Sequence, residues 1–153
     1  MRKKYKRKKG PVRSKKVTFD GITFASGLEK YMYQALKNAG LHTTAIYEGM
    51  TFILQEGFMF NIDSYERQGN GKGTMINRGQ KKILNIKYTP DFVSPSFIIE
   101  CKGRANESFP LRWKMFKKYV NHKMKHVTLY KPQNQKECDK VVELILTKIK
   151  EKL

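Results

Sequence analysis

The sequence lacks several features that would assign it to a class at once. It has only two cysteines in 153 residues, Cys101 and Cys138. Two are too few for a disulfide scaffold, and they do not have the C-x-x-C spacing of a zinc knuckle or a redox pair. No apolar run approaches the ~18 residues of a membrane span, and the charged N-terminus lacks the apolar stretch of a secretory signal. We therefore expect a cytoplasmic protein with reduced thiols.

Negative charge is also scarce. The chain has 32 Lys and Arg against 13 Asp and Glu, a formal net charge of +19. A field of this sign attracts polyanions, which include nucleic acids and anionic membranes. The basic head, residues 2–9, has no bulky apolar face and contains Tyr5 as its one aromatic residue, unlike a membrane-binding helix. We therefore expect a nucleic-acid partner and no membrane.

The charge is distributed unevenly along the chain. Residues 1–16 contain 10 Lys and Arg and no acidic residue. Such a block repels itself, so we expect a disordered N-terminal arm until it meets phosphate. Residues 17–153 keep an excess of positive charge but contain the apolar residues of a core, and we expect them to form a single domain.

Hydrophobic periodicity predicts an α/β protein. Residues 26–39 have helical spacing, begin with Ser26 and Glu29 as a capping box and end before Gly40. A second helix is predicted over 109–120, with Leu111, Phe116, Tyr119 and Val120 facing inward, and a third begins at about residue 134. Strands are predicted within 43–60, at 83–88, 91–93, 97–102 and 127–130, with a loop at 67–73 as the tip of a hairpin. This order predicts a mixed β-sheet flanked by helices.

The chemically informative stretch runs from Pro90 to Lys102. Side chains alternate along a strand, so Glu100 and Lys102 share one face and Cys101 points to the other. Asp91 begins the preceding strand, which can bring its carboxylate beside that of Glu100. Two converging carboxylates need a cation, and oxygen ligands favour Mg²⁺ or Mn²⁺. Such an ion can activate water and offset charge on a phosphate, while Lys102 can orient the water or stabilise the transition state.

Each part of this pattern has a simpler interpretation when taken alone. An E-x-K sequence on a strand is often a surface ion pair, and Pro-Asp is often a turn. Glu29 is fully explained as the second half of a capping box. The combination is more informative, because charged residues within so apolar a sheet are costly unless they are paired or bind a metal.

Residues Pro90, Asp91, Glu100 and Lys102, with Glu29 on the upstream helix, resemble the motif of the PD-(D/E)XK nuclease superfamily. Within it, the sequence is most similar to the phage endonuclease I family of Holliday-junction resolving enzymes. The resemblance implies a restriction-endonuclease-like fold, a Mg²⁺-dependent endodeoxyribonuclease and a homodimer, in the host cytoplasm if phage-encoded. It implies catalytic roles for Asp91, Glu100, Lys102 and Glu29, and metal ligands at Asp91, Glu100, Glu29 and the Cys101 backbone carbonyl.

Basic residues outside this motif are candidates for DNA contacts. They lie in the basic head, in the glycine-rich loop and on the predicted helix after the motif: Arg2, Lys3, Lys4, Lys6, Arg7, Lys8, Lys9, Lys72, Arg112, Lys114, Lys117 and Lys118. We expect branched or four-way-junction DNA as the substrate. A restriction-like, nicking or repair nuclease on linear duplex remains open, as does a non-catalytic nucleic-acid-binding protein.

Overall fold

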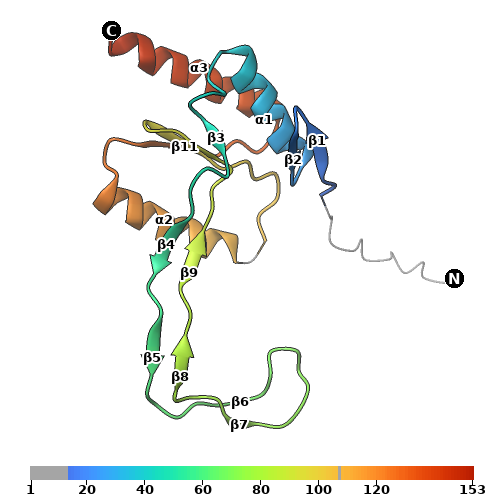
Figure 1. Cartoon of the computed structure of the whole chain (residues 1–153), viewed down its shortest axis with the longest axis vertical. Coiled ribbons are helices and arrows are strands. Elements are labelled where there is room, and N and C mark those ends of the chain that lie inside the picture. The colour runs from blue at the N-terminus through green and yellow to red at the C-terminus, as the bar shows by residue number, and fades with distance from the viewer. Residues whose placement is uncertain (1–13, 107) are drawn as a thin grey trace, which may run out of the picture.

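The computed structural model describes residues 14–106 and 108–153 and is a mixed α/β structure, as the sequence predicts (Figure 1). The basic head and its candidate DNA contacts lie outside these residues. Within them, no helix is long and apolar enough to cross a membrane. The elements in chain order are β1 (Val17–Phe19), β2 (Ile22–Phe24), α1 (Gly27–Asn38), β3 (Ile46–Tyr47), β4 (Phe52–Gln55), β5 (Phe58–Phe60), β6 (Tyr65–Glu66), β7 (Ile76–Asn77), β8 (Lys81–Ile83), β9 (Ile86–Tyr88), β10 (Phe92–Val93), β11 (Phe97–Ile99), α2 (Phe109–Lys123), β12 (Thr128–Tyr130) and α3 (Gln135–Glu151).

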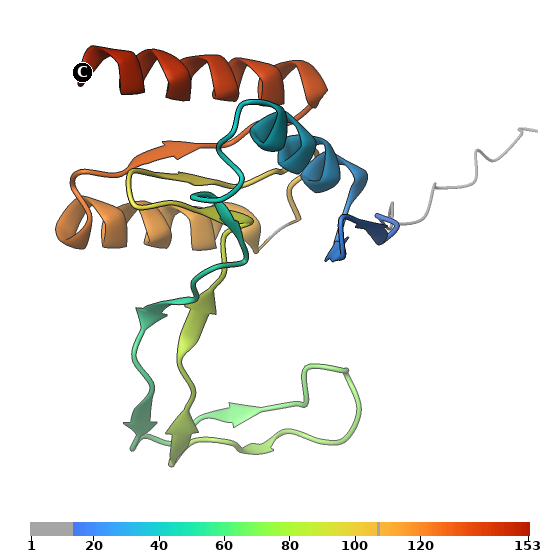
Figure 2. The ribbon, with the colours of Figure 1, turned by 45° about the horizontal axis from the view of Figure 1, so that its top comes forward.

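A four-stranded sheet in the order β12-β11-β10-β3 lies at the centre of the body. Strand β12 runs parallel to β11, whereas β10 is antiparallel to both β11 and β3, so the sheet is mixed. Figure 2 shows α3 above this sheet and α2 below it, with α1 on the same side as α3. The predicted mixed sheet with flanking helices is therefore present.

The apolar run on β11 is explained by burial on both faces of the sheet. Phe97 and Ile99 pack into the core formed with α1 and α3, and Ile98 packs into the core formed with α2. All three side chains are almost completely buried. A strand covered on both sides needs apolar residues at every position rather than at alternate positions.

The caps of α1 and α3 follow the sequence signals. Ser26 Oγ accepts a hydrogen bond from the Glu29 amide at 3.2 Å, and Asn134 Oδ1 accepts one from the Glu137 amide at 2.9 Å. These bonds satisfy amides that have no partner within the helix. Gly40 follows α1 with φ of 72°, a left-handed conformation that glycine adopts without strain.

Residues 52–88 form a long two-stranded arm, which projects from the body in both views (Figures 1 and 2). Its antiparallel pairs are β4 with β9, β5 with β8 and β6 with β7, and the predicted loop lies at the far end. Phe52 anchors the near end, because its ring lies 5.2 Å from that of Phe116 on α2 between centroids. The predicted long hairpin is therefore confirmed.

The structure differs from the sequence predictions in the arm. The strand predicted over residues 83–88 is interrupted between β8 and β9, where Asn85 Oδ1 accepts a hydrogen bond from the Gly57 amide. A Cβ at Gly57 would lie 2.6 Å from the carbonyl oxygen of Ile83, so the strands approach closely here. Side-chain alternation did not indicate this break, because the partner of the Asn85 side chain is a backbone amide 28 positions away in sequence.

Three further differences lie outside the arm, and the first is that β11 ends at Ile99 rather than at residue 102. Leu111 was predicted to face inward but is 64% exposed, because the buried face of α2 is formed by Phe109, Trp113, Phe116 and Val120. The β1–β2 hairpin was not predicted, although Asp20-Gly21 is a strong signal for a two-residue turn. Both turn residues have positive φ, 57° and 74°.

Two apolar residues of α2, Phe116 and Leu111, should differ sharply in their contribution to stability. Phe116→Ala should reduce the free energy of unfolding by about 3–5 kcal/mol, because it leaves a cavity between Tyr88, Phe52 and Trp113. Leu111→Ala should change it by less than about 0.5 kcal/mol. Urea denaturation measures the free energy of unfolding of both variants. If Leu111→Ala lowers it as much as Phe116→Ala does, the assignment of the buried face of α2 is wrong.

Candidate active site

Asp91 and Glu100 lie at the adjoining ends of β10 and β11. Phe92 is paired with Ile99 in the antiparallel register, so the residues just outside this pair, Asp91 and Glu100, are opposite one another. Asp91 Oδ2 also accepts a hydrogen bond from the Cys101 amide at 2.6 Å. Strand register and this bond bring together two carboxyl groups that are nine positions apart in sequence.

Burial makes both carboxyl groups costly to ionise. The pKa of Asp91 is raised from its ordinary 3.8 to about 8, first by burial and then by the negative charges of Glu100 and Glu29. Burial also raises the pKa of Glu100, which is 6% exposed, although Tyr88 and Lys102 partly oppose this shift. Within residues 14–106 and 108–153, neither carboxylate forms an ion pair. A bound cation would relieve this cost.

Tyr88 holds Glu100 from the side of α2. Its hydroxyl donates a hydrogen bond of 2.7 Å to Glu100 Oε2, and its ring lies 4.7 Å from that of Phe116 between centroids. Burial and the charge of Glu100 raise the pKa of Tyr88, so the phenol keeps its proton and remains a donor. From the sequence, Tyr88 was placed only in the strand predicted over residues 83–88. The one sign of a polar role was that its hydroxyl would be buried there and would need a hydrogen-bond partner.

Glu29 is held by three hydrogen bonds at the start of α1. Its carboxylate accepts from the Ser26 hydroxyl at 2.9 Å, the Ala25 amide at 3.1 Å and the Tyr47 hydroxyl at 2.6 Å. Its charge raises the pKa of Asp91, so it belongs to the same electrostatic centre. Both Glu29 oxygens are therefore engaged as part of the helix cap. Tyr47 is a second polar partner that sequence reasoning missed.

Lys102 lines the same cleft as Glu100, whereas Cys101 packs into the core formed with α1 and α3. Its charge lowers the pKa of both Asp91 and Glu100, but by less than burial raises them. The Lys102 ammonium lies 4.8 Å from the ring centroid of Phe109, a cation–π contact that holds it beside the carboxylates. Its amide bonds to the Pro132 carbonyl at 3.0 Å and continues the pairing of β11 with β12.

Two depressions open on either side of this centre. A cleft of about 330 Å³ is lined by Glu100, Lys102, Tyr88, Lys87 and Arg112. A wider depression of about 860 Å³ is lined by residues that include Glu29, Cys101 and Arg104, and it shares Lys102 with the first. Charged groups of both signs therefore face the same accessible space.

The predicted DNA contacts in the described residues are distributed over three places. Arg112 lines the cleft beside Glu100, whereas Lys114, Lys117 and Lys118 are exposed on α2 outside its lining. Lys72 lies in the loop at the far end of the arm. The structure therefore brings one of these five basic side chains next to the carboxylates.

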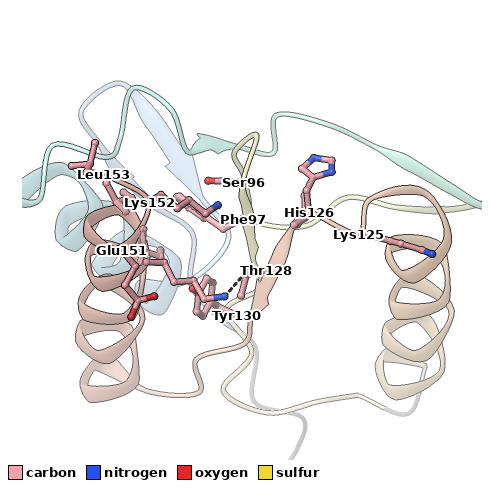
Figure 3. Close-up of a pocket in the computed structure, with 13 residues that line it drawn as sticks. Ser96, Phe97, Lys125, His126, Thr128, Tyr130, Glu151, Lys152 and Leu153 are labelled. Carbon is pink, nitrogen blue, oxygen red and sulfur yellow. Dashed lines mark hydrogen bonds between the residues drawn. The ribbon is translucent and has the colours of Figure 1, made fainter.

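A further cavity of about 610 Å³ lies between the end of α3 and β12 (Figure 3). Lys125, His126 and Lys152 surround it, and Lys148 Nζ donates to Thr128 Oγ1 at 2.9 Å. Its one acidic side chain is that of Glu151, and neither Asp91 nor Glu100 lines it. It lacks a pair of adjacent carboxylates, so the candidate site is the centre at Asp91 and Glu100.

The oxygen atoms at this centre are of the kind that bind a hard divalent cation. Asp91 Oδ1 accepts no hydrogen bond from the described residues and is available for a ligand, and the Asp91 backbone amide also bonds to the Glu100 carboxylate and lowers its pKa. Oxygen donors of this kind suit Mg²⁺ or Mn²⁺. However, within the described part of the chain no three His, Cys, Asp or Glu side chains lie close enough together to hold a metal ion. Two carboxylates and the Cys101 carbonyl would therefore form the protein's share of the site.

The fold and site define a mixed α/β protein with a buried acidic centre at the edge of two depressions. Residues 4–134 match the family described as "Protein of unknown function (DUF1064)", and the chain belongs to that family. The matched region contains Glu29, Asp91, Glu100 and Lys102, whereas α3 follows it. No curated protein and no solved structure matches the chain.

Removing the charge of Asp91 should stabilise the metal-free protein in a pH-dependent way. Between pH 4 and 8 the folded protein keeps a proton on Asp91 that the unfolded chain releases, so stability falls as pH rises through this range. Asp91→Asn should therefore raise Tm in EDTA more at pH 8 than at pH 5.

Asp20→Asn is the matched control for this measurement. The Asp20 carboxylate is paired with Lys37, which lowers the pKa of Asp20 below 3.8. Its contribution is already complete at pH 5, so this variant should lower Tm equally at pH 5 and pH 8. If the change in Tm caused by Asp91→Asn is the same at pH 5 and pH 8, the raised pKa of Asp91 is wrong.

Proposed function

We propose that this protein is a metal-dependent DNA endonuclease with a restriction-endonuclease-like fold. The observation that carries the proposal is the pairing of the half-buried Asp91 with the buried Glu100, neither of which forms an ion pair within the described residues, with Lys102 lining the same cleft as Glu100. A merely structural pair of acids would destabilise the protein without a compensating gain. The resemblance to the PD-(D/E)XK motif and the strongly positive charge of the chain support the same proposal.

The carboxylates of Asp91 and Glu100 would hold the metal ion, together with the Cys101 carbonyl. A bound Mg²⁺ supplies Lewis acidity and lowers the pKa of a coordinated water. The Cys101 amide and the Tyr88 hydroxyl fix one oxygen of each carboxylate, so the second oxygens keep a constant direction. This order in the free protein reduces the reorganisation needed when substrate binds.

Lys102 and Arg112 would act on the phosphate. Both side chains line the cleft that contains Glu100. The Lys102 ammonium would stabilise the negative charge that develops on the phosphate oxygens during hydrolysis, and Arg112 would bind a neighbouring phosphate through its planar guanidinium. Glu29 would contribute mainly charge, because hydrogen bonds already occupy its carboxylate oxygens.

Branched DNA is the substrate that this proposal favours. The basic residues are spread over the head, the arm and α2, and a spread of charge suits recognition of backbone and shape more than of base edges. A four-way junction concentrates phosphates at its branch point without requiring a fixed sequence. Symmetric cleavage of two strands would need two such centres, so we propose a homodimer.

Alanine substitutions test the catalytic centre. Asp91→Ala, Glu100→Ala and Lys102→Ala should each reduce Mg²⁺-dependent cleavage by about 100-fold or more, because each removes a ligand or a transition-state contact. DNA binding in EDTA should largely persist, since most affinity comes from phosphate contacts elsewhere. Glu143→Ala, an exposed acid on α3 paired with Lys140, is the control and should leave cleavage unchanged. Cleavage near the wild-type rate in any two of the three variants would refute the proposed centre.

Competition binding at fixed salt tests the substrate. A four-way junction should bind at least ~10-fold tighter than linear duplex of the same length, a difference of about 1.4 kcal/mol. Gel analysis should show Mg²⁺-dependent cuts near the branch point in paired strands, and sizing of the free protein should give a dimer. Equal affinity for the two DNAs with equal cleavage would instead identify a nuclease for linear duplex. Binding without cleavage under any metal would identify a non-catalytic binder.

A further inference from the structure

The arm of residues 52–88 has more exposed apolar surface than an isolated ribbon can easily tolerate. Beyond β4 and β9, its strands pair with one another in an extension that projects away from the body (Figures 1 and 2). Two-stranded ribbons are marginally stable in water, and contiguous exposed apolar groups indicate a partner. The large exposed side chains include Phe58, Met59, Ile62, Tyr65, Met75 and Leu84.

These apolar side chains lie on both faces of the ribbon. Phe58 and Met59 are neighbours on β5, so they point to opposite faces, and they are 45% and 56% exposed. A flat partner, such as a membrane surface or another sheet, would cover one face and leave the other in water. A groove with two walls and a floor would contact both faces at once.

Lysines lie directly opposite apolar residues along the same ribbon. The register pairs Lys87 with Ile53, Lys82 with Met59 and Lys81 with Phe60. The acidic residues of the arm are fewer, and Asp63 is bonded to Asn77 and Gln80. The ribbon is therefore positively charged as well as apolar, a combination that suits a polyanion with accessible base edges.

We propose that the arm inserts into the major groove of duplex DNA. This groove is wide enough for a two-stranded ribbon, whereas the major groove of duplex RNA is too narrow. The lysines of β8 and β9 would contact phosphates along one wall, and the apolar side chains on both faces would contact thymine methyl groups within the groove. The arm of a second copy is a poorer partner, because basic residues outnumber acidic ones in both arms and the two would repel one another.

The near end of the arm leads into the candidate active site. Lys87 lines the cleft that contains Glu100 and Lys102, and the next residue, Tyr88, donates its hydroxyl to Glu100. A duplex held along the arm would therefore extend toward the carboxylates. The inference deepens the proposed nuclease function and rests on it for the identity of the substrate as DNA.

Substitution of Lys81 and Lys82 tests the inference. The double variant Lys81→Gln, Lys82→Gln should weaken binding of a 30-base-pair duplex and reduce the slope of log affinity against log salt by about 2, because two phosphate contacts are lost. Both side chains are exposed, so the fold should survive, and an unchanged Tm checks this. Lys136→Gln, Lys150→Gln on α3 removes the same charge on the far side of the body and should leave the slope nearly unchanged (Figure 2).

Protection of guanine N7 from methylation, an atom in the major groove, reports where the arm lies. Wild-type protein should protect a run of guanines, and the arm variant should lose this protection while the α3 control keeps it. An unchanged salt slope with unchanged protection would overturn the inference. So would an arm variant that retains DNA affinity but loses self-association in sedimentation, or loses binding to phosphatidylserine vesicles.

The outcome for the arm can be separated from the outcome for catalysis. Binding and methylation protection are measured in EDTA, where no cleavage is expected. If wild-type protein shows arm-dependent protection but no cleavage in Mg²⁺ or Mn²⁺, the arm inference stands and the nuclease proposal fails. If cleavage proceeds in Mg²⁺ at the wild-type rate in the arm variant, with protection unchanged, the arm inference fails alone.

Discussion

Asp91 and Glu100 lie opposite one another because β10 and β11 are antiparallel and paired in one particular register. Burial makes the charges of both carboxyl groups costly, and the structure leaves them without an ion pair in its described residues. In the metal-free protein Asp91 keeps its proton below about pH 8, and neighbouring groups fix the two carboxyl groups in place. The amide of Cys101 and the hydroxyl of Tyr88 provide that fixation, and these groups depend in turn on the sheet and on α2.

Hydrogen bonds from tyrosines connect this centre to its supporting elements. Tyr88 ends β9 and bonds to Glu100, while Tyr47 on β3 bonds to Glu29 on α1. Each ring packs in a different core, Tyr88 against Phe116 and Tyr47 against Phe92. The positions of the acids are therefore determined by packing on both sides of the sheet, which a surface ion pair would not require.

Helix α2 has two roles that explain its unusual composition. Its buried face packs aromatic rings against the near end of the arm, and Phe109 at its start holds the Lys102 ammonium. The opposite face is exposed and basic, with Lys114 and Lys118 in solvent. The same helix thus supports the acidic centre and contributes positive charge next to it.

The sequence by itself determined the local features: the capped helices, the two short strands β10 and β11, and the alternation that separates Glu100 from Cys101. These follow from backbone geometry and near neighbours, so a one-dimensional pattern contains them. The tertiary structure alone decided that Tyr88 and Tyr47 hold the acids and that Leu111 faces solvent. It also decided that residues 52–88 project as an arm. Each of these depends on contacts between elements that are distant in sequence. The local sequence around a tyrosine or a leucine does not show which residue it will contact.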